Sequence, residues 1–260
     1  ASIAGQITGT SAILTGPTGE GKTLAFGLPV AQALLEAPKA RQDDTDGPSC
    51  LVLAPTRDLA QQTAKLLRPF VPCSLLVGGA SLDKQRRLLD RCAPIIVATP
   101  GRLLEVVEKV RHPQILSMLG LEGRTPTLRH LILDEADRML QGGRYPELDV
   151  VLSLVRSGLR DGSFKKGQLR LVLVSATLSL PHVKGVVERD LGHQVSAEQE
   201  KVFKGMLVDE VGDKVTTTDT PPQNAEEKRN AVLLKTLSPR LHGLHSVAPI
   251  EIYDTTTQII

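Results

Sequence analysis

The sequence predicts an α/β domain built in layers around a mostly parallel sheet. Short, continuous apolar runs bounded by turn residues recur along the chain, as expected of strands that are buried on both faces. Segments with apolar residues at helical spacing lie between these runs, so strand and helix alternate. With 260 residues, of which 41% are hydrophobic and 23% charged, the chain is long enough for one large domain with a full-sized core.

The strand signals are short apolar runs that end at turn residues. The first is SAILT at residues 11–15, and the last is APIEIYD at residues 248–254, which we expect to return to the same sheet. Ligands of parallel sheets gather at the carboxyl ends of the strands, so functional residues are expected where these runs end. The intervening strands are predicted at residues 50–55, 73–79, 93–100, 128–135 and 168–177.

The helix signals are apolar residues repeated at intervals of three and four. One such segment, at residues 22–37, follows the first strand directly, and the last is expected at residues 181–189. Together with the strands they give the alternating order of a layered sheet. The other helices are predicted at residues 57–70, 81–92, 101–110 and 137–155.

Two polar stretches depart from this alternation. Residues 37–49 have the composition of a solvated loop, and residues 191–246 show weak periodicity, with one short helix expected at residues 230–237. We interpret the second stretch as a partly disordered insertion in a domain that spans residues 1–190 and ends, with the start of a linker, at residues 247–260. Two roles for it stay open: a docking segment for a protein partner and a disordered surface loop.

Composition excludes several classes of protein. No apolar run is long enough to span a bilayer, so no membrane segment is expected. The chain begins without an initiator Met or a secretory signal, and we expect it to be part of a longer protein. Cys50, Cys73 and Cys92 form no C-x-x-C pair, which favours buried, reduced thiols in an intracellular compartment over disulfides or zinc. The sequence does not separate nucleus from cytoplasm.

Charge and aromatic content limit how a nucleic acid would be bound. The net charge of +2 is too small to argue for nucleic-acid binding by itself. Four Phe, two Tyr and no Trp disfavour a platform that stacks bases on aromatic rings. A nucleic acid bound here would therefore be held by its backbone.

The stretch GPTGEGKT at residues 16–23 has the spacing of a phosphate-binding loop. Glycines let the backbone wrap around phosphates with its N–H groups inward, and the helix that follows adds its positive end. Lys22 is expected to reach the β- and γ-phosphates of ATP, and the Thr23 hydroxyl to bind Mg²⁺. A glycine-rich turn is the alternative, but the flanking strand and helix speak against it. The predicted nucleotide-binding residues are Gly16, Pro17, Thr18, Gly19, Glu20, Gly21, Lys22 and Thr23.

The run LILDEAD ends a predicted strand with acidic residues. Asp134 is expected to hold Mg²⁺, and Glu135 to position or deprotonate the water that attacks a γ-phosphate. Taken alone, the run also fits an acidic first turn of the next helix, stabilised by the helix dipole. Combined with a phosphate loop, the catalytic interpretation is favoured, with Lys22 as the third catalytic residue.

Other strand ends carry residues suited to a nucleic-acid phosphate. APTRDLA places Thr56 and Arg57 at the start of a helix, and ATPGR places Thr99 and Arg102 at the start of another. Each combines a hydroxyl, free helix N–H groups and a guanidinium. Alone, Thr followed by Pro is also an ordinary N-cap, and the Gly78–Gly79 pair is also a tight turn. Both interpretations stay open from the residues themselves.

The run LVLVSATL leaves Ser175 and Thr177 at the end of a strand. Their hydroxyls would be able to bond the acidic cluster and report its state to a partner domain. Local turns and helix caps use the same residue types, so this signal is weak in isolation.

The order of these motifs resembles that of the first RecA-like domain of DEAD-box RNA helicases. GPTGEGKT, PTRDLA, GG, TPGR, DEADRML and SAT follow one another, and the resemblance covers residues 9–190 and 249–260. It implies a three-layer P-loop NTPase (RecA-like) domain of an ATP-dependent RNA helicase, which uses ATP and Mg²⁺ to close two domains over RNA and bend a short duplex apart. The rivals are a DNA helicase or translocase and a non-catalytic RNA-binding scaffold.

The resemblance also implies roles for residues outside the nucleotide site. Coupling between the ATP and RNA sites is implied for Asp137, Arg138, Ser175 and Thr177. The implied partners are RNA, through its sugar-phosphate backbone, and a second RecA-like domain in the same parent chain. Contact with the RNA backbone is implied for Pro55, Thr56, Arg57, Gly79, Thr99, Pro100, Gly101 and Arg102.

The sequence departs from the family pattern at several places. The family reads adenine with a Gln well upstream of the phosphate loop, and Gln6 lies too close to that loop to replace it. The second RecA-like domain, which brings an arginine finger, lies outside this sequence, so the chain alone is expected to bind ATP weakly and hydrolyse it slowly. Gly143 stands where the family often has Phe, and the insertion has no counterpart in a minimal family core.

Overall fold

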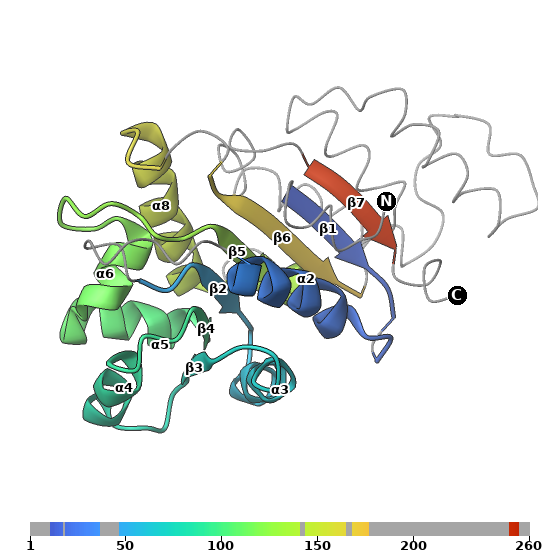
Figure 1. The fold of residues 1–260 in the computed structure, drawn as a ribbon, viewed down its shortest axis with the longest axis horizontal. Coiled ribbons are helices and arrows are strands. Elements are labelled where there is room, and N and C mark those ends of the chain that lie inside the picture. Colours follow the sequence, from blue (N-terminus) through green and yellow to red (C-terminus); the bar gives the residue numbers. More distant parts are fainter. Residues whose placement is uncertain are drawn as a thin grey trace, which may run out of the picture.

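A parallel seven-stranded sheet is the centre of the computed structural model, which describes residues 11–17, 19–36, 47–140, 144–164, 168–176 and 250–254. The strands lie in the order β3-β4-β2-β5-β6-β1-β7, and every neighbouring pair is parallel (Figure 1). The predicted class of fold is confirmed. The strands are β1 (Ser11–Thr15), β2 (Cys50–Leu53), β3 (Cys73–Leu76), β4 (Ile95–Ala98), β5 (His130–Leu133), β6 (Arg170–Ser175) and β7 (Ile250–Asp254).

Helices cover both faces of the sheet and complete the three layers. The helices α2 (Lys22–Glu36) and α3 (Arg57–Leu67) bury Phe26 and Ala64 in one core cluster with residues of the strands. The remaining helices bury their apolar side chains in the cluster on the other face. These are α4 (Leu82–Leu89), α5 (Pro100–Glu105), the π-helical turn η1 (Val106–Val110), α6 (Pro113–Leu119), α7 (Ala136–Met139) and α8 (Pro146–Arg160).

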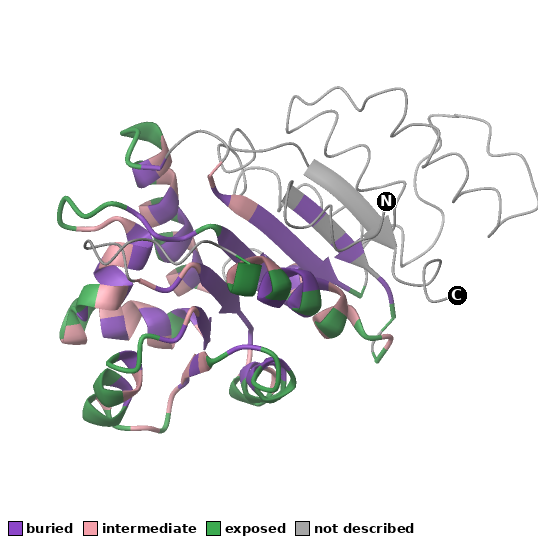
Figure 2. Cartoon of the chain, viewed as in Figure 1, coloured by how far each residue is buried: buried purple, intermediate pink, exposed green. Residues whose placement is uncertain are grey.

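Strand β2 shows why the apolar runs are continuous. Cys50 and Val52 belong to the cluster beneath α2 and α3, whereas Leu51 and Leu53 belong to the cluster on the opposite face. Successive side chains of a strand point to opposite faces, so a strand covered on both sides needs apolar residues at every position. All four residues are fully buried, and Figure 2 shows the same burial along the centre of the sheet.

The single helix predicted at residues 137–155 is wrong. Helix α7 ends at Met139, and α8 begins only at Pro146 and continues to Arg160. Proline has no N–H to donate, and its ring clashes with the preceding turn, so it fits the first turn of a helix but breaks an interior. Asp137 and Arg138 therefore lie in α7, an element separate from the long amphipathic helix α8. Gly143 lies outside the described residues.

Other expectations also differ from the structure. Helix α6 was not predicted from the sequence; it begins at Pro113, is capped after Leu119 by Gly120 in the left-handed region, and buries Ile115 and Met118. The predicted helix at residues 101–110 is divided into α5 and η1. Of the three cysteines predicted to be buried, only Cys50 is; Cys73 is half-buried and Cys92 is exposed, because it follows the end of α4 in a turn.

The predicted return of the last strand is confirmed, since β7 pairs in parallel with β1 and places Ile250 beside Ser11. The insertion at residues 191–246, its short helix, the helix predicted at residues 181–189 and the end of the linker lie outside the described residues. The domain boundaries stay a prediction. In the described ranges, none of the helices combines the length and the apolar character needed to cross a bilayer.

Two glycines on either side of a short turn test how close packing adds to backbone strain. Gly120 and Gly123 have φ values of 68° and 71°, so alanine is strained at both. A Cβ on Gly120 would lie 2.5 Å from Cγ of Pro126, whereas one on Gly123 would meet nothing within 4 Å. We expect Gly123→Ala to lower the free energy of unfolding in urea by about 1 kcal/mol, and Gly120→Ala by about 2–4 kcal/mol. Equal losses would contradict the predicted clash.

Candidate functional site

The loop between β1 and α2 has a backbone that only glycine adopts freely. Gly19 and Gly21 have φ values of 92° and 81°. A Cβ at either position would meet no protein atom within 4 Å, so the backbone conformation, and not crowding, requires glycine. The Gly21 carbonyl accepts hydrogen bonds from Leu24 N and Ala25 N, both at 2.9 Å, and so starts α2 at the end of the loop. The free N–H groups of this helix therefore lie next to the loop.

Lys22 lies across this loop. Its Nζ donates to the carbonyl oxygens of Gly16, at 2.5 Å, and Pro17, at 2.6 Å. Burial lowers the pKa of Lys22, and the acidic residues near it, Asp134 foremost, oppose that shift. The ammonium group is thus held by two carbonyl dipoles of the same loop. Thr23, the next residue of α2, is half-buried beside it.

Asp134 is a buried carboxyl group at the end of β5, 5% exposed. Its Oδ1 accepts a hydrogen bond from Glu135 N at 3.1 Å, and its Oδ2 accepts one from Thr63 Oγ1 at 3.2 Å. Burial raises the pKa of Asp134 to about 6, while the Thr63 hydroxyl and the Lys22 charge act in the opposite direction. Lys22 and Asp134 therefore belong to one electrostatic site, at the carboxyl edge of the sheet.

Glu135 occupies a strained position. Its φ and ψ of 51° and 50° lie in the left-handed region, which costs a residue other than glycine roughly 1–2 kcal/mol. The turn aims its N–H at Asp134 and starts α7 directly afterwards. Its carboxylate is partly exposed and lies 3.4 Å from Nη1 of Arg138. The structure thus keeps the Glu135 carboxylate accessible while that of Asp134 is enclosed.

A second group of predicted residues lies at the start of α3. Thr56 is the N-cap, and its Oγ1 accepts a hydrogen bond from Leu59 N at 3.3 Å, so the capping interpretation of Thr56 holds. Arg57 is exposed, with Nη1 3.5 Å from the carbonyl oxygen of Gly78. Gly79 has a φ of 93°, and a Cβ there would lie 3.0 Å from Arg57 Nη1. The structure therefore brings PTRDLA and the GG pair together; Pro55 is buried below them.

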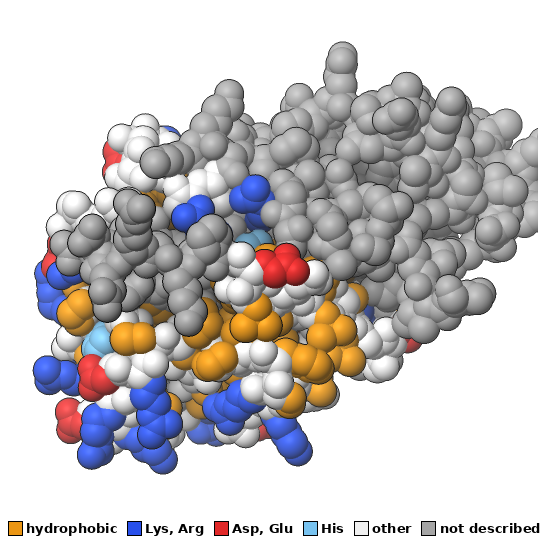
Figure 3. Space-filling view, viewed as in Figure 1, with side chains coloured by type: hydrophobic (Ala, Val, Ile, Leu, Met, Phe, Trp, Pro, Cys, Tyr) orange, Lys and Arg blue, Asp and Glu red, His pale blue; other side chains and the backbone are white. Residues whose placement is uncertain are grey.

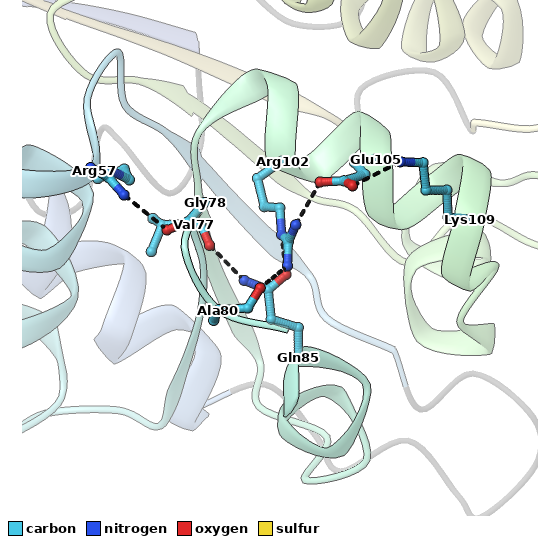
Figure 4. A network of polar contacts seen from close by, with 8 residues as sticks. All are labelled: Arg57, Val77, Gly78, Ala80, Gln85, Arg102, Glu105 and Lys109. Carbon is cyan, nitrogen blue, oxygen red and sulfur yellow. Dashed lines mark hydrogen bonds and ion pairs between the residues drawn. The ribbon is translucent and has the colours of Figure 1, made fainter. Parts of the chain in front are cut away.

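The TPGR residues lie at the start of α5. Thr99 is the N-cap but its side chain makes no capping bond, Pro100 is buried at N1, and Gly101 is exposed. The RNA contact implied for Arg102 stays a prediction, and its side chain is only 9% exposed in the structure. Its nitrogens donate to Gln85 Oε1 at 2.6 Å, to Glu105 Oε2 at 2.5 Å and to the carbonyl oxygen of Ala80 (Figure 4).

The predicted coupling residues have different surroundings. Asp137 is half-buried and acts electrostatically on Lys22, whereas Arg138 is exposed and pairs with Glu135. Ser175 is buried at the end of β6, where it lies beside Thr15 of β1. Thr18 and Thr177 lie outside the described residues.

Two buried polar residues that contact predicted site residues were not predicted from the sequence. Thr63 lies inside α3, and Gln85 lies inside α4, both almost fully buried. A polar residue on the apolar face of an amphipathic helix is the signal that could have found them, because a buried polar group needs a partner. The partners, Asp134 and Arg102, are distant in sequence and follow only from the fold.

A family model described as DEAD/DEAH box helicase matches residues 1–186. The ATP-dependent RNA helicase MAK5 of Eremothecium gossypii is 37% identical over 177 residues, which cover 64% of this chain and 22% of that protein. The ATP-dependent DNA helicase DDX31 of Dictyostelium discoideum is 34% identical over 186 residues, which cover 69% of this chain and 19% of that protein. The chain thus spans about a fifth of the length of these two relatives.

The fold also matches a solved structure. Mss116p bound to ssRNA and AMP-PNP aligns with a TM-score of 0.53 and 27% identity, over 69% of this chain and 34% of that one. The fold is therefore similar to that of a solved structure that holds a nucleotide analogue.

Asp134→Asn is expected to stabilise the chain near neutral pH. The pKa of Asp134, about 6, lies above its ordinary value of 3.8, so the folded chain retains a proton that the unfolded chain releases. Stability from this group is therefore present below pH 4 and is lost as pH rises to 6. In urea unfolding with EDTA we expect the variant to gain about 1–3 kcal/mol at pH 7 and to show a flatter profile between pH 4 and 6. An unchanged dependence of the free energy of unfolding on pH would contradict the proposed cost of burying the Asp134 carboxylate.

Proposed function

The chain belongs to the DEAD/DEAH box helicase family, and we propose that it is the ATP-binding and RNA-backbone-binding half of an ATP-dependent RNA helicase that locally unwinds or remodels RNA. One observation carries the proposal. Lys22 of the phosphate loop and the buried Asp134 lie in one electrostatic site, at the same sheet edge as the turns that carry Arg57 and Gly79. A nucleotide site and a phosphate-binding surface are then neighbours.

The nucleotide site has the groups needed for phosphoryl transfer to water. The loop from Gly16 to Thr23 would bind the phosphates through its N–H groups, and Lys22 would exchange its two carbonyl partners for phosphate oxygens. The donor set fits magnesium, because an enclosed carboxylate and a hydroxyl are hard oxygen ligands for an ion shared with phosphates. Asp134 and Thr23 would hold it, and the ion would neutralise charge on the transferred phosphoryl group.

Glu135 would act on the attacking water. Its carboxylate is partly exposed, next to a carboxylate that is enclosed, so the two acids have separate roles. Glu135 would orient the water and accept its proton as the oxygen bonds to the γ-phosphorus and the bond to the bridging oxygen of ADP breaks. The ion pair with Arg138 would hold the carboxylate until then.

The RNA surface would be formed by turns and helix starts rather than by aromatic rings. Arg57 is exposed beside the Gly78–Gly79 turn, and the first N–H groups of α3 and α5 lie at the same edge. The exposed Lys84, Arg86 and Arg87 of α4 follow this turn, and Figure 3 shows Lys and Arg side chains gathered over that end of the face. A field of this sign attracts a polyanion.

The parent protein would contain more than this chain. The relatives are several times longer, and a second RecA-like domain would bring the arginine that completes the site and the other half of the RNA groove. Asp137, Arg138, Ser175 and Thr177 would report the state of the nucleotide to that domain. The segment at residues 191–246 is proposed as the docking site of a protein partner. If its deletion left the set of bound proteins unchanged, a surface loop without a docking role would be favoured.

A DNA helicase is the second candidate, because one relative carries that name. The ordered motif set and the structural relative with bound ssRNA favour RNA. Stimulation of ATP hydrolysis by DNA but not by RNA oligonucleotides would reverse this choice.

Glu135→Gln in the full-length protein is expected to abolish turnover but not binding. Removal of the base that accepts a proton from water should lower RNA-stimulated ATP hydrolysis by about 10²–10⁴-fold. ATP-dependent binding of RNA, measured by fluorescence anisotropy, should persist, because the phosphate loop is intact. Glu36→Gln, at the far end of α2, is the matched control and should change neither quantity. Full hydrolysis in Glu135→Gln would assign catalysis elsewhere.

The chain on its own is expected to hydrolyse ATP far more slowly than the full-length protein. An arginine supplied from outside is worth roughly 10³–10⁵ in rate in related phosphoryl transfers. Single-turnover hydrolysis with saturating RNA compares the two proteins directly. RNA-stimulated hydrolysis by the chain at the full-length rate would show that its own residues complete the site.

A further inference from the structure

We propose that Thr63 is a positioning residue for the metal site, whose hydroxyl holds the Asp134 carboxylate in the direction in which it would bind Mg²⁺. The inference rests on the proposed function and deepens it, because it concerns the same nucleotide site. Thr63 lies in the interior of α3, outside the motifs that predicted the site. It would touch neither the nucleotide nor the ion, and would act through Asp134.

Three different elements hold Asp134. Its backbone N donates to the carbonyl oxygen of Leu53 in β2 at 2.9 Å. Its Oδ1 accepts from Glu135 N, in the turn after β5, at 3.1 Å, and its Oδ2 accepts from Thr63 Oγ1 in α3 at 3.2 Å. Among the residues that the structure describes, Thr63 supplies the one side-chain hydrogen bond to this carboxyl group. The direction of the carboxyl group is therefore set by α3 as well as by the strand that carries it.

These hydrogen bonds leave the carboxylate able to bind an ion. An ionised carboxylate has about four acceptor positions, of which Thr63 and Glu135 use one each. The last torsion of an Asp side chain has broad minima, so the carboxylate rotates unless a neighbour holds it. The Thr63 hydroxyl removes that freedom before an ion binds. Partners that orient a metal ligand in this way raise the affinity for the metal.

The charge of Lys22 does not replace this contact. Lys22 stabilises the ionised form of Asp134 electrostatically, but its Nζ donates to two carbonyl oxygens of the phosphate loop. An ammonium group acts on a distant carboxylate as a point charge, which prefers neither of the two oxygens. The field of Lys22 therefore favours the charge, whereas the Thr63 hydroxyl sets its direction.

The surroundings of Thr63 suit a fixed contact. Its side chain is fully buried on the apolar face of α3. A hydroxyl without a partner would be costly there, and the bond to Asp134 satisfies it. A β-branched side chain has few rotamers in a helix, so the hydroxyl and the methyl group are both kept in place. Thr63 thus offers its donor in one direction.

Close packing fixes α3 relative to the nucleotide site. Helix α2, which begins with Lys22 and Thr23, lies against α3 so closely that a Cβ on Gly27 would collide with Cδ2 of Leu67. Closely packed elements do not shift independently of one another. The hydroxyl that holds Asp134 and the Thr23 hydroxyl proposed to bind the same ion are therefore carried by two helices in contact.

The effect of Mg²⁺ on nucleotide affinity tests this role. In the full-length protein, the affinity for a fluorescent ADP analogue is measured with Mg²⁺ and with EDTA. A pH of 8.5 keeps Asp134, whose pKa is about 6, ionised. Thr63→Val replaces the hydroxyl by a methyl group, and it should reduce the ratio of the two affinities about 10-fold while the affinity in EDTA is unchanged. A general loss of structure would instead lower both affinities.

Two further variants separate position from packing. Thr63→Ser keeps the hydroxyl but loses a buried methyl group, so it should destabilise the chain in urea and still retain most of the Mg²⁺ effect. Ala64→Gly, at the next residue of α3, weakens the helix without removing a contact of Asp134 and should leave the ratio unchanged. An equal loss of the Mg²⁺ effect in all three variants would assign Thr63 to packing alone and overturn the inference.

A double-mutant cycle measures the contact without metal or nucleotide. In the 260-residue chain with EDTA at pH 8.5, Thr63→Val should raise the equilibrium constant for unfolding about 10-fold, and much less in an Asp134→Ala background. Equal effects in the two backgrounds, or an unchanged Mg²⁺ effect in Thr63→Val, would overturn the inference. Absence of any Mg²⁺ effect in the unaltered protein would instead refute the proposed metal site, and the cycle would still decide whether Thr63 holds Asp134.

Discussion

The burial of the Asp134 carboxylate near the Lys22 ammonium group is the constraint on which the proposed site depends. Asp134 is removed from water at the end of β5, and its ionised form is maintained by a hydroxyl, a backbone N–H and the charge of Lys22. Even together these contributions do not cancel the effect of burial, which raises the pKa of Asp134 to about 6. In the proposed function the same burial would strengthen the attraction of this carboxylate for a dication, because a charge in a poorly solvated site gains more from a counter-charge than one in water. At neutral pH the burial of this carboxylate lowers the free energy of unfolding of the domain.

Helix α3 joins the two proposed sites. Thr56 and Arg57 stand at its start, beside the Gly78–Gly79 turn, and Thr63 donates to Asp134 from two turns further on. Seven residues of helix span about 10 Å, so one rigid element carries a side chain of each site. The sheet order explains the arrangement, because β2, which precedes α3, lies directly beside β5. Neighbouring parallel strands end at the same edge, and the helix that follows one strand therefore meets the acid that follows the other.

The fold and the backbone of the glycine-rich loop follow from local sequence, whereas the inward direction of the Arg102 side chain does not. Strands such as β2 were predictable because burial on both faces leaves a continuous apolar run. The glycine-rich loop before α2 was predictable because its motif has fixed spacing, and phosphate binding by Lys22 stays a prediction. The spacing in TPGR says nothing about where a guanidinium finds acceptors, and Gln85 reaches Arg102 only after α4 folds back on the sheet. Helix α6 was missed because seven residues give too short a periodic signal. Residues that act through a distant partner are the part that sequence alone leaves open.

The sheet is complete only after β7 has been synthesised, because β7 pairs with β1. Strand β1 takes one neighbour from β6, which begins at Arg170, and the other from β7, which begins at Ile250, eighty positions after the start of β6. At about 5–20 residues per second, a ribosome needs roughly 4–16 s to make that interval. During this delay the outer edge of β1 offers unpaired backbone groups to any other extended chain nearby. Nascent domains of this topology are therefore candidates for chaperone capture before the last strand emerges.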